Sequence, residues 1–208
     1  KRFSMPWSKP AARMEDMVNA IKAILNAWQN ESRLEHRGDF YTHTLMTPLF
    51  NPGPNPHGIP KIYVAAVGPL MTKAVARSAD GLLAHPFNTP TYLNNVTLPL
   101  IDEALSSVNK QRDAFDLSIS VMTGIGATEE SHKKAVRACR DQVAFYASTP
   151  NYKAVLEQHG YEGLSSELNR LSKEGKWQQM GNAIDDEILN TFAVISESPQ
   201  KLATEILN

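Results

Sequence analysis

The sequence is poor in the features that mark secreted, membrane-spanning and nucleic-acid-binding proteins. Its 208 residues include one cysteine, so no internal disulfide can form, and we expect a reducing, cytoplasmic setting. No apolar run approaches the roughly 20 residues that a membrane-spanning helix needs. Lys and Arg number 21 against 22 Asp and Glu, whereas nucleic-acid and anionic-membrane partners favour a basic excess. We therefore expect a globular domain with a buried core and neither kind of partner.

Short catalytic and metal-binding motifs are also missing. The chain has no HExxH, no CxxC and no nucleophile elbow. His36 and His43 flank a possible strand pair, but no carboxylate or cysteine completes a metal-ligand spacing there. Cys139 falls on the apolar stripe of a predicted helix, which favours a core thiol over a nucleophile. We expect no metal site, and the residues alone identify no catalytic group.

The middle of the chain alternates short apolar strands with amphipathic helices. We expect strands over 62–67, 81–85 and 116–127, each followed by a helix. The first of these is a continuous apolar run, typical of a strand buried on both faces. Gly81 is expected to end the helix over 69–80 in a left-handed conformation. This alternation implies parallel strands with helical crossovers, in either a doubly wound sheet or a (β/α)8 barrel.

The flanking segments are less regular. A helix is predicted over 11–29 from apolar residues spaced three and four apart. Residues 31–60 form a long loop with a possible hairpin, since five prolines and two glycines crowd its second half. Such a loop is either functional and lid-like or a structural excursion, and the sequence favours neither. Residues 150–186 read as a helical excursion, followed by a strand at "TFAVIS" and a helix at "SPQKLATEIL".

The dipeptide Gly68-Pro69 ends the first strand and begins the next helix. In parallel α/β folds, the carboxyl ends of the strands form the functional face. Glycine lets a ligand approach the backbone, and the free N–H groups of Leu70, Met71 and Thr72 at the helix N-terminus would suit a phosphate. A plain strand-to-helix turn explains the same residues, and is favoured while the stretch is considered alone.

His85 ends the next predicted strand, so it belongs to the same face. Its imidazole could donate to a cofactor or substrate oxygen or act as an acid or base, but a lone histidine more often satisfies a loop carbonyl. Trp7, Phe40 and Phe87 are candidates for lining a flat-ring pocket, although aromatic residues more often serve packing.

Several stretches together resemble the bacterial luciferase-like superfamily. The central one is "IYVAAVGPLMTKAVARSADGLLAHPFNTPTYL", with a strand ending in small residues, a Gly-Pro turn, a helix ending in Ala-Asp-Gly and a short strand ending in a polar residue. "RGDFYTHTLMTP" and "SPQKLATEIL" resemble the hairpin before this signature and the helix before the last barrel strand. The branch of coenzyme F420-dependent oxidoreductases is most similar, through "TLMTP", "FNPGP" and "HPF".

The resemblance implies an α/β fold of the TIM-like (β/α)8 type with a flavin or deazaflavin at the carboxyl-end face. Carried over position by position, it places Ala66, Val67 and Gly68 beside the ring or its side chain. Pro69, Leu70, Met71 and Thr72 match the helix start that holds the phosphate, and His85 matches the polar position near the ring. Coenzyme F420 is the expected cofactor, with FMN as the alternative, and a small organic molecule is the expected substrate.

The same resemblance implies that residues 1–208 form one partial barrel domain, roughly the C-terminal half. We expect the first half of the barrel to precede Lys1 and the last strand to follow Asn208. The leading hypothesis is an oxidoreductase or monooxygenase that exchanges hydride between F420 and its substrate, assembled as a homo-oligomer. The alternatives are an FMN-dependent monooxygenase, a non-catalytic cofactor-binding barrel and an inactive fragment, because open sheet edges disfavour a free-standing piece.

Overall fold

The computed structural model describes residues 8–207, and Trp7 therefore lies outside the described residues. The chain divides into two compact units. Unit 1 comprises residues 1–83 and 98–118, and unit 2 comprises residues 84–97 and 119–208. The assignment of the whole chain to one partial barrel domain stays a prediction.

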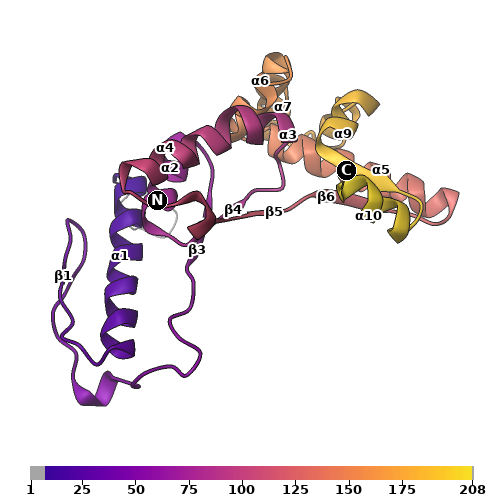
Figure 1. Ribbon diagram of the computed structural model, residues 1–208. Helices are drawn as coiled ribbons and strands as arrows, with labels where there is room; N and C mark the ends of the chain where they lie inside the picture. The colour runs from indigo at the N-terminus through magenta and orange to yellow at the C-terminus, as the bar shows by residue number, and fades with distance from the viewer. Residues whose placement is uncertain (1–7, 208) are drawn as a thin grey trace. The chain divides into compact units, whose positions relative to one another are not determined.

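Three helices form the frame of unit 1 (Figure 1). Helix α1 (Pro10–Gln29) packs against α2 (Pro69–Ser78), and α2 packs against α4 (Leu98–Ser107). Consecutive small residues let α2 approach both neighbours, since Ala74, Val75 and Ala76 are fully buried. At the edge of the α1–α2 contact, the Arg77 guanidinium donates to both carboxylate oxygens of Glu15, at 2.9 and 2.6 Å. The helix predicted over 11–29 is confirmed.

A three-stranded sheet completes unit 1, with β4 (Gly81–Ala84) between β3 (Tyr63–Ala66) and β5 (Asp116–Ile119). Only the last residues of β4 and β5, Ala84 and Ile119, are assigned to unit 2. The short 3₁₀ turn η3 (Arg112–Ala114) leads into β5. The prediction that the first strand is buried on both faces is wrong, because its residues alternate between exposed and half-buried. In the described sheet β3 has a neighbour on one side only, and an apolar run alone does not distinguish an edge strand from a central one.

Gly81 has a different role from the predicted one. Helix α2 ends at Ser78, with Ala79 in extended geometry at φ −89° and ψ 173°, and Gly81 is absent from the glycines with positive φ. Gly81 begins β4, where a Cβ atom would lie 2.5 Å from the Tyr63 ring and 2.8 Å from the carbonyl oxygen of Asp116. Glycine is needed there because the Tyr63 ring of β3 and the Asp116 carbonyl of β5 crowd this position of β4 from both sides, not because the helix needs a left-handed end.

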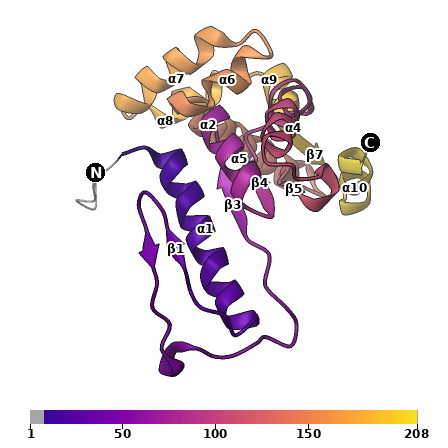
Figure 2. The ribbon, with the colours of Figure 1, turned by 60° about the vertical axis from the view of Figure 1, so that its left-hand side comes forward.

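Residues 31–60 contain a short antiparallel hairpin and a long irregular stretch. Strands β1 (His36–Arg37) and β2 (Thr42–His43) pair with His36 opposite His43, and Figure 2 shows the hairpin beside α1. The rest contains one 3₁₀ turn, η1 (Pro48–Phe50). The predicted strand pair is confirmed. The prediction that prolines prevent regular strands and helices in the second half of this segment is confirmed as well.

Unit 2 is built on a parallel strand pair and a long helix. Strands β6 (Met122–Ile125) and β7 (Ala193–Ser196) pair in parallel, with Met122 opposite Ala193. Helix α5 (Glu129–Ala147) packs on this pair and begins with a capping box between Thr128 and Ser131. The terminal helix α10 (Pro199–Leu207) contacts β7.

The helical excursion after α5 completes the core of unit 2. It consists of η4 (Pro150–Tyr152), α6 (Lys153–Glu157), α7 (Glu162–Lys173), α8 (Trp177–Asn182) and α9 (Asp186–Phe192). Leu156, Leu168 and Ile184 from this segment are fully buried in the same core as Val143 of α5. The excursion is therefore part of the hydrophobic core of its unit.

Two predicted elements are divided in the structure. The strand expected over 116–127 is two strands, β5 in the sheet of unit 1 and β6 in the pair of unit 2, separated at Ser120 and Val121. The helix after β4 is α3 (Pro90–Tyr92), capped by the Thr89 hydroxyl, then a π-helical turn η2 (Leu93–Thr97), then α4. The break at Ser120 and Val121 is not marked by glycine or proline, so hydrophobic periodicity could not predict it. Pro99 lies just after the π-helical turn, where its missing N–H removes a helical hydrogen bond.

Candidate functional site

The turn between β3 and α2 requires a glycine. Gly68 has φ 82° and ψ 157°, a combination that is accessible essentially to glycine alone. Pro69 occupies the first helical position, where a missing N–H costs nothing. The Thr72 N–H and hydroxyl both donate to the Gly68 carbonyl, at 3.1 and 3.0 Å. These two hydrogen bonds fix the direction in which α2 leaves the strand.

The turn offers backbone N–H groups to a ligand. The N–H groups of Leu70 and Met71 precede the first bond within α2, as at any helix start. The space at Gly68 is open, since an added Cβ atom would meet no atom within 4 Å, and Leu70 is 78% exposed. A negatively charged group is favoured at such a helix start by the helix dipole, so the residues present fit a cofactor phosphate.

The side chains near this turn contribute less than the sequence suggests. The Thr72 side chain is buried, and its hydroxyl proton is used by the Gly68 carbonyl. Lys73 Nζ lies 2.6 Å from a carboxylate oxygen of Glu103 on α4, so its charge is already paired. The anion-binding capacity of the turn therefore comes from the backbone, with Ala66 half-buried and Val67 exposed just before it.

His85 follows β4 in unit 2 and is enclosed by aromatic rings. Its imidazole stacks on Tyr152 with ring centroids 4.7 Å apart, and it meets Tyr146 edge to face at 4.6 Å. Its Nδ1 accepts the N–H of Phe87 at 3.1 Å. Burial lowers the pKa of His85 below its usual value, because removal from water disfavours the charged imidazole. His85 is therefore neutral at physiological pH.

The predicted site residues fall into two groups. Ala66 to Thr72 are contiguous at the β3–α2 turn of unit 1, whereas His85 belongs to unit 2. The expectation that they converge on one face stays a prediction. Sequence reasoning missed Tyr146 and Tyr152 as neighbours of His85, because they lie 61 and 67 positions along the chain (146 − 85 and 152 − 85) and no local pattern connects them.

The other candidate residues serve packing. Phe87 is 1% exposed and stacks on Phe192 at 4.4 Å with nearly parallel rings. Phe40 lies under the Arg13 guanidinium at 4.5 Å, a cation–π contact. Cys139 is buried, and burial raises the pKa of its thiol. The assignment of Cys139 to the core is thereby confirmed.

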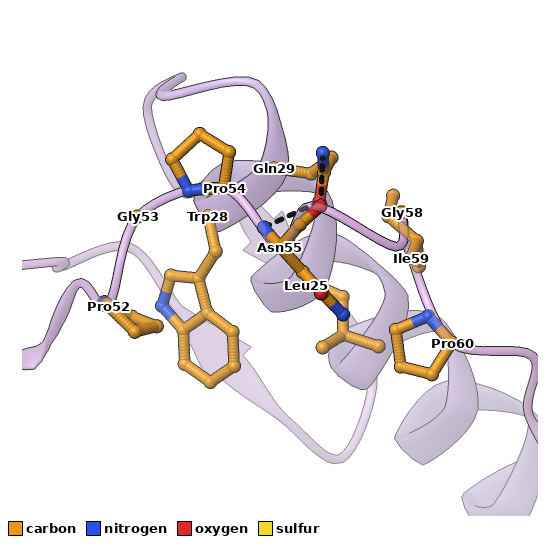
Figure 3. A pocket seen from close by; sticks show the side chains of 10 residues that line it. All are labelled: Leu25, Trp28, Gln29, Pro52, Gly53, Pro54, Asn55, Gly58, Ile59 and Pro60. Atoms are coloured by element: carbon orange, nitrogen blue, oxygen red, sulfur yellow. Dashed lines mark hydrogen bonds between the residues drawn. The ribbon is translucent and has the colours of Figure 1, made fainter.

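The loop of unit 1 closes over the end of α1 and leaves a hollow of about 290 Å³. Figure 3 shows Trp28 and Leu25 of α1 on one side of it and the segment from Pro52 to Pro60 on the other. The Gln29 amide bonds the backbone of Asn55, accepting its N–H at 3.1 Å and donating to its carbonyl at 3.3 Å. These polar groups are used to attach the loop to α1, so they do not select a ligand.

Within residues 8–207, no group of three or more His, Cys, Asp or Glu side chains is placed to hold a metal ion. Over the same residues, no helix has both the length and the apolar character needed to cross a bilayer.

Comparison with known proteins identifies relatives over nearly the whole chain. An uncharacterized protein of Mycobacterium tuberculosis is 48% identical over 195 residues, which cover 94% of this chain and 57% of that protein. The 5,10-methylenetetrahydromethanopterin reductase of Archaeoglobus fulgidus is 28% identical over 215 residues, covering 99% of this chain and 59% of the enzyme. The chain therefore spans less than two thirds of the length of these relatives.

Solved structures agree with the expected fold. The coenzyme F420-dependent tetrahydromethanopterin reductase from Methanopyrus kandleri matches with a TM-score of 0.70 and 20% identity, covering 97% of this chain and 55% of that one. An F420-dependent secondary alcohol dehydrogenase matches with a TM-score of 0.61 and 17% identity. The fold is thus the α/β, TIM-like barrel of the luciferase-like type, of which this chain covers about half. The model of the luciferase-like monooxygenase family matches residues 1–208, and the chain belongs to this family.

Proposed function

We propose that this chain is part of an F420-dependent oxidoreductase that transfers hydride between the deazaflavin and a small organic substrate. Family membership supports an oxidoreductase. The F420-dependent enzymes among the relatives and solved neighbours, which include F420-dependent glucose-6-phosphate dehydrogenase at 28% identity over 170 residues, support this cofactor. The proposal concerns the whole protein, because the chain covers only part of each relative.

The observation that carries the proposal is the backbone of Gly68. Only glycine adopts this conformation without steric strain, and here it opens space directly before a helix N-terminus. We assign the phosphate of the cofactor to the N–H groups of Leu70 and Met71, with Thr72 holding the turn. Ala66 and Val67 would then lie beside the ring or its side chain, and His85 would donate to an oxygen atom.

When bound, the cofactor supplies the hydride acceptor or donor. The protein's own residues bind its phosphate, orient the ring and limit the access of water. FMN remains the alternative cofactor, because a helix N-terminus binds any phosphate ester and distinguishes little between the two molecules. The chain also belongs to a family named for monooxygenases, which favours FMN as the second candidate. No catalytic residue is assigned within residues 1–208.

The experiment is a binding titration of the longest natural protein that contains these residues, with F420 and FMN in separate samples. We expect F420 to bind, measured by its change in fluorescence, and Gly68→Ala to weaken binding at least about tenfold, equivalent to about 1.4 kcal/mol. Preferential binding of FMN would move the assignment to a flavin monooxygenase. Binding of neither by a folded protein would overturn both assignments.

A control variant separates backbone strain from loss of the site. Gly160, in unit 2, also has a positive φ of 76° and no atom within 4 Å of an added Cβ. Gly160→Ala should therefore strain its turn and leave F420 affinity unchanged. If both variants weaken binding equally, the effect is general destabilisation and the assignment of the phosphate site to Gly68 is wrong.

Two further properties belong to the same proposal. We infer a homo-oligomer in the cytoplasm that acts on a small molecule. The buried thiol of Cys139 and the absence of a candidate membrane span in residues 8–207 are compatible with this setting. Light scattering of the purified protein tests the oligomeric state directly, and a monodisperse monomer would contradict it.

A further inference from the structure

The hollow between the end of α1 and the long loop of unit 1 is lined mainly by apolar groups. We call it the α1 hollow, and its volume is about 290 Å³. The described residues that line it carry no charge, and Figure 3 shows Leu25, Trp28 and Ile59 there together with three prolines. Ile59 is 44% exposed, so part of this apolar lining remains in contact with water.

The indole of Trp28 is held in one orientation at the α1 hollow. Its Nε1–H donates to the thioether sulfur of Met46 at 3.3 Å, a bond from the loop to the helix. Because this N–H is the only polar group of the indole, the bond satisfies it and leaves the rest of the ring as apolar surface. The ring is half-buried, so a ligand that enters the hollow meets a fixed aromatic surface.

The loop side of the hollow is also fixed before any ligand binds. The Asn55 carbonyl accepts the Gly58 N–H at 3.0 Å and the Gln29 side-chain amide at 3.3 Å. Pro52 and Pro54 precede this turn, and each proline ring restricts the backbone to a narrow range of φ. A ligand would therefore lose little binding free energy to ordering the walls of the hollow.

The size and chemistry of the hollow select a class of ligand. An apolar cavity of about 150 Å³ is enough to bind benzene, so a hollow of about 290 Å³ has room for one or two aromatic rings. Its polar amides are already bonded to the loop, and the residues that line it offer no charge to a phosphate or carboxylate. An uncharged flat molecule fits these walls better than an anion does.

The α1 hollow is separate from the turn that is assigned to the cofactor phosphate. Both lie in unit 1, but at opposite ends of β3. Pro60, which lines the hollow, precedes the first residue of the strand, whereas Gly68 follows its last residue. A molecule in the hollow therefore does not occupy the Gly68 turn.

We propose that the α1 hollow is a second binding site, which takes a small neutral aromatic molecule of one or two rings. The ligand packs against the indole of Trp28, where aromatic pairs gain stability beyond the area they bury. It also removes the exposed part of Ile59 from water, which is favourable because apolar surface is poorly hydrated. This site goes beyond the proposed function and does not depend on it.

The test uses quinoline, a two-ring aromatic that is neutral at physiological pH, and the longest natural protein that contains these residues. The chain has three tryptophans, and Trp28→Phe identifies the indole N–H resonance of Trp28 in a proton–nitrogen-15 spectrum. We expect quinoline to shift this resonance saturably and to leave that of Trp177, in unit 2, unchanged. No shift, a shift that does not saturate, or an equal shift at Trp177 would overturn the inference.

A pair of variants tests the location. Ile59→Asp places a charge in the apolar wall and should weaken quinoline binding at least about tenfold. Leu49→Asp is the matched control, because Leu49 is 86% exposed on the same loop and does not line the hollow. An unchanged Trp28 resonance in ligand-free Ile59→Asp shows that the bond to Met46 is intact. Equal weakening in both variants, or in neither, would overturn the location.

Two further titrations test the ligand class and the separation of the sites. Benzyl alcohol should bind at least about tenfold more tightly than cyclohexylmethanol, its non-aromatic counterpart, and equal affinities would overturn the aromatic assignment. Saturating F420 should leave quinoline affinity unchanged, and displacement of quinoline would show that the hollow belongs to the cofactor site. Failure of F420 to bind would overturn the proposed function, whereas quinoline binding decides this inference by itself.

Discussion

Asp16 Oδ1 lies 2.8 Å from His36 Nε2, and the other carboxylate oxygen of Asp16 accepts the N–H groups of Phe40 and Tyr41 at 2.7 and 3.0 Å. One carboxylate on α1 therefore holds the first strand of the β1–β2 hairpin and the turn that leads into the second. Gly38 makes the contact possible, because any Cβ atom there would collide with the carboxylate. Asp16 is the main polar attachment of the hairpin to the helix.

This attachment predicts a loss of hairpin order in acid. Burial acts to raise the pKa of Asp16, but hydrogen bonds from Phe40, His36 and Tyr41 outweigh it and hold the pKa below 3.8. A lowered pKa means that the stabilisation is complete above about pH 4 and is lost as pH falls through the folded-state value. The protection of the Phe40 and Tyr41 amides, measured as the exchange rate relative to the intrinsic rate at each pH, should therefore fall only at low pH, and a fall near neutral pH would contradict the assignment.

The variant Asp16→Asn should reproduce this effect at neutral pH, since a neutral amide accepts the hairpin N–H groups more weakly. Asp39→Asn is the matched control, because Asp39 is an exposed carboxylate in the same hairpin. Exchange at Phe40 should accelerate in Asp16→Asn and stay unchanged in Asp39→Asn.

Gly81→Ala should destabilise the protein by about 1–3 kcal/mol, because the new methyl group overlaps the Tyr63 ring and the Asp116 carbonyl. Gly163→Ala provides a contrast of opposite sign. Gly163 lies in α7 with no atom within 4 Å of an added Cβ and without a positive φ, so alanine should stabilise by about 0.4–1 kcal/mol. Urea denaturation of both variants measures the difference, and equal destabilisation would refute the steric explanation.

Thr128→Ala should cost about 0.5–2 kcal/mol, as expected for loss of a helix N-cap. The Thr128 hydroxyl accepts the Ser131 N–H at 3.2 Å, and Ser131 Oγ accepts the Thr128 N–H at 2.8 Å. Thr128→Ser keeps this hydroxyl and should keep most of the stability. Thermal unfolding followed by circular dichroism compares the two, and a serine variant as unstable as the alanine variant would exclude the cap as the cause.

Lys73→Gln should change F420 affinity by less than about tenfold, in contrast to Gly68→Ala. Lys73 is paired with Glu103 at 2.6 Å near the surface, and exposed ion pairs contribute about 1 kcal/mol or less. A fluorescence titration at two salt concentrations measures this. A large, salt-dependent loss of affinity in Lys73→Gln would mean that the lysine leaves Glu103 to bind the phosphate.

Cys139 should resist alkylation in the folded protein. Its side chain is 4% exposed and its thiol pKa is raised by burial, so the reactive thiolate is both rare and covered. Mass spectrometry after treatment with iodoacetamide should find Cys139 unmodified under native conditions and modified in urea. Rapid native alkylation would show that α5 separates from β6.

The sequence predicted what depends on neighbours within a few residues. The stripe of α1 and the turn at Gly68 were both predicted because hydrophobic periodicity and glycine chemistry are local properties. The fold class was predicted from the resemblance to the family, because no local property of the sequence determines it.

The sequence failed where distant residues decide the structure. Gly81 was misread because its contacts with Tyr63 and Asp116 come from two other strands. The break at Ser120 and Val121 was missed because β-branched and small polar residues continue the strand pattern. The partners of His85 come from α5 and η4, which only the folded chain brings together.

The division of the chain between two units has a consequence for genetic dissection. The polypeptide passes from one unit to the other after Leu83, after Thr97 and after Ser118. A fragment ending at Leu83 would lose α4 and β5, and one starting at Ala84 would carry α4 without α2 to cover it. Neither unit can be expressed as one uninterrupted stretch of the gene, so separating them requires two joined segments and a designed linker.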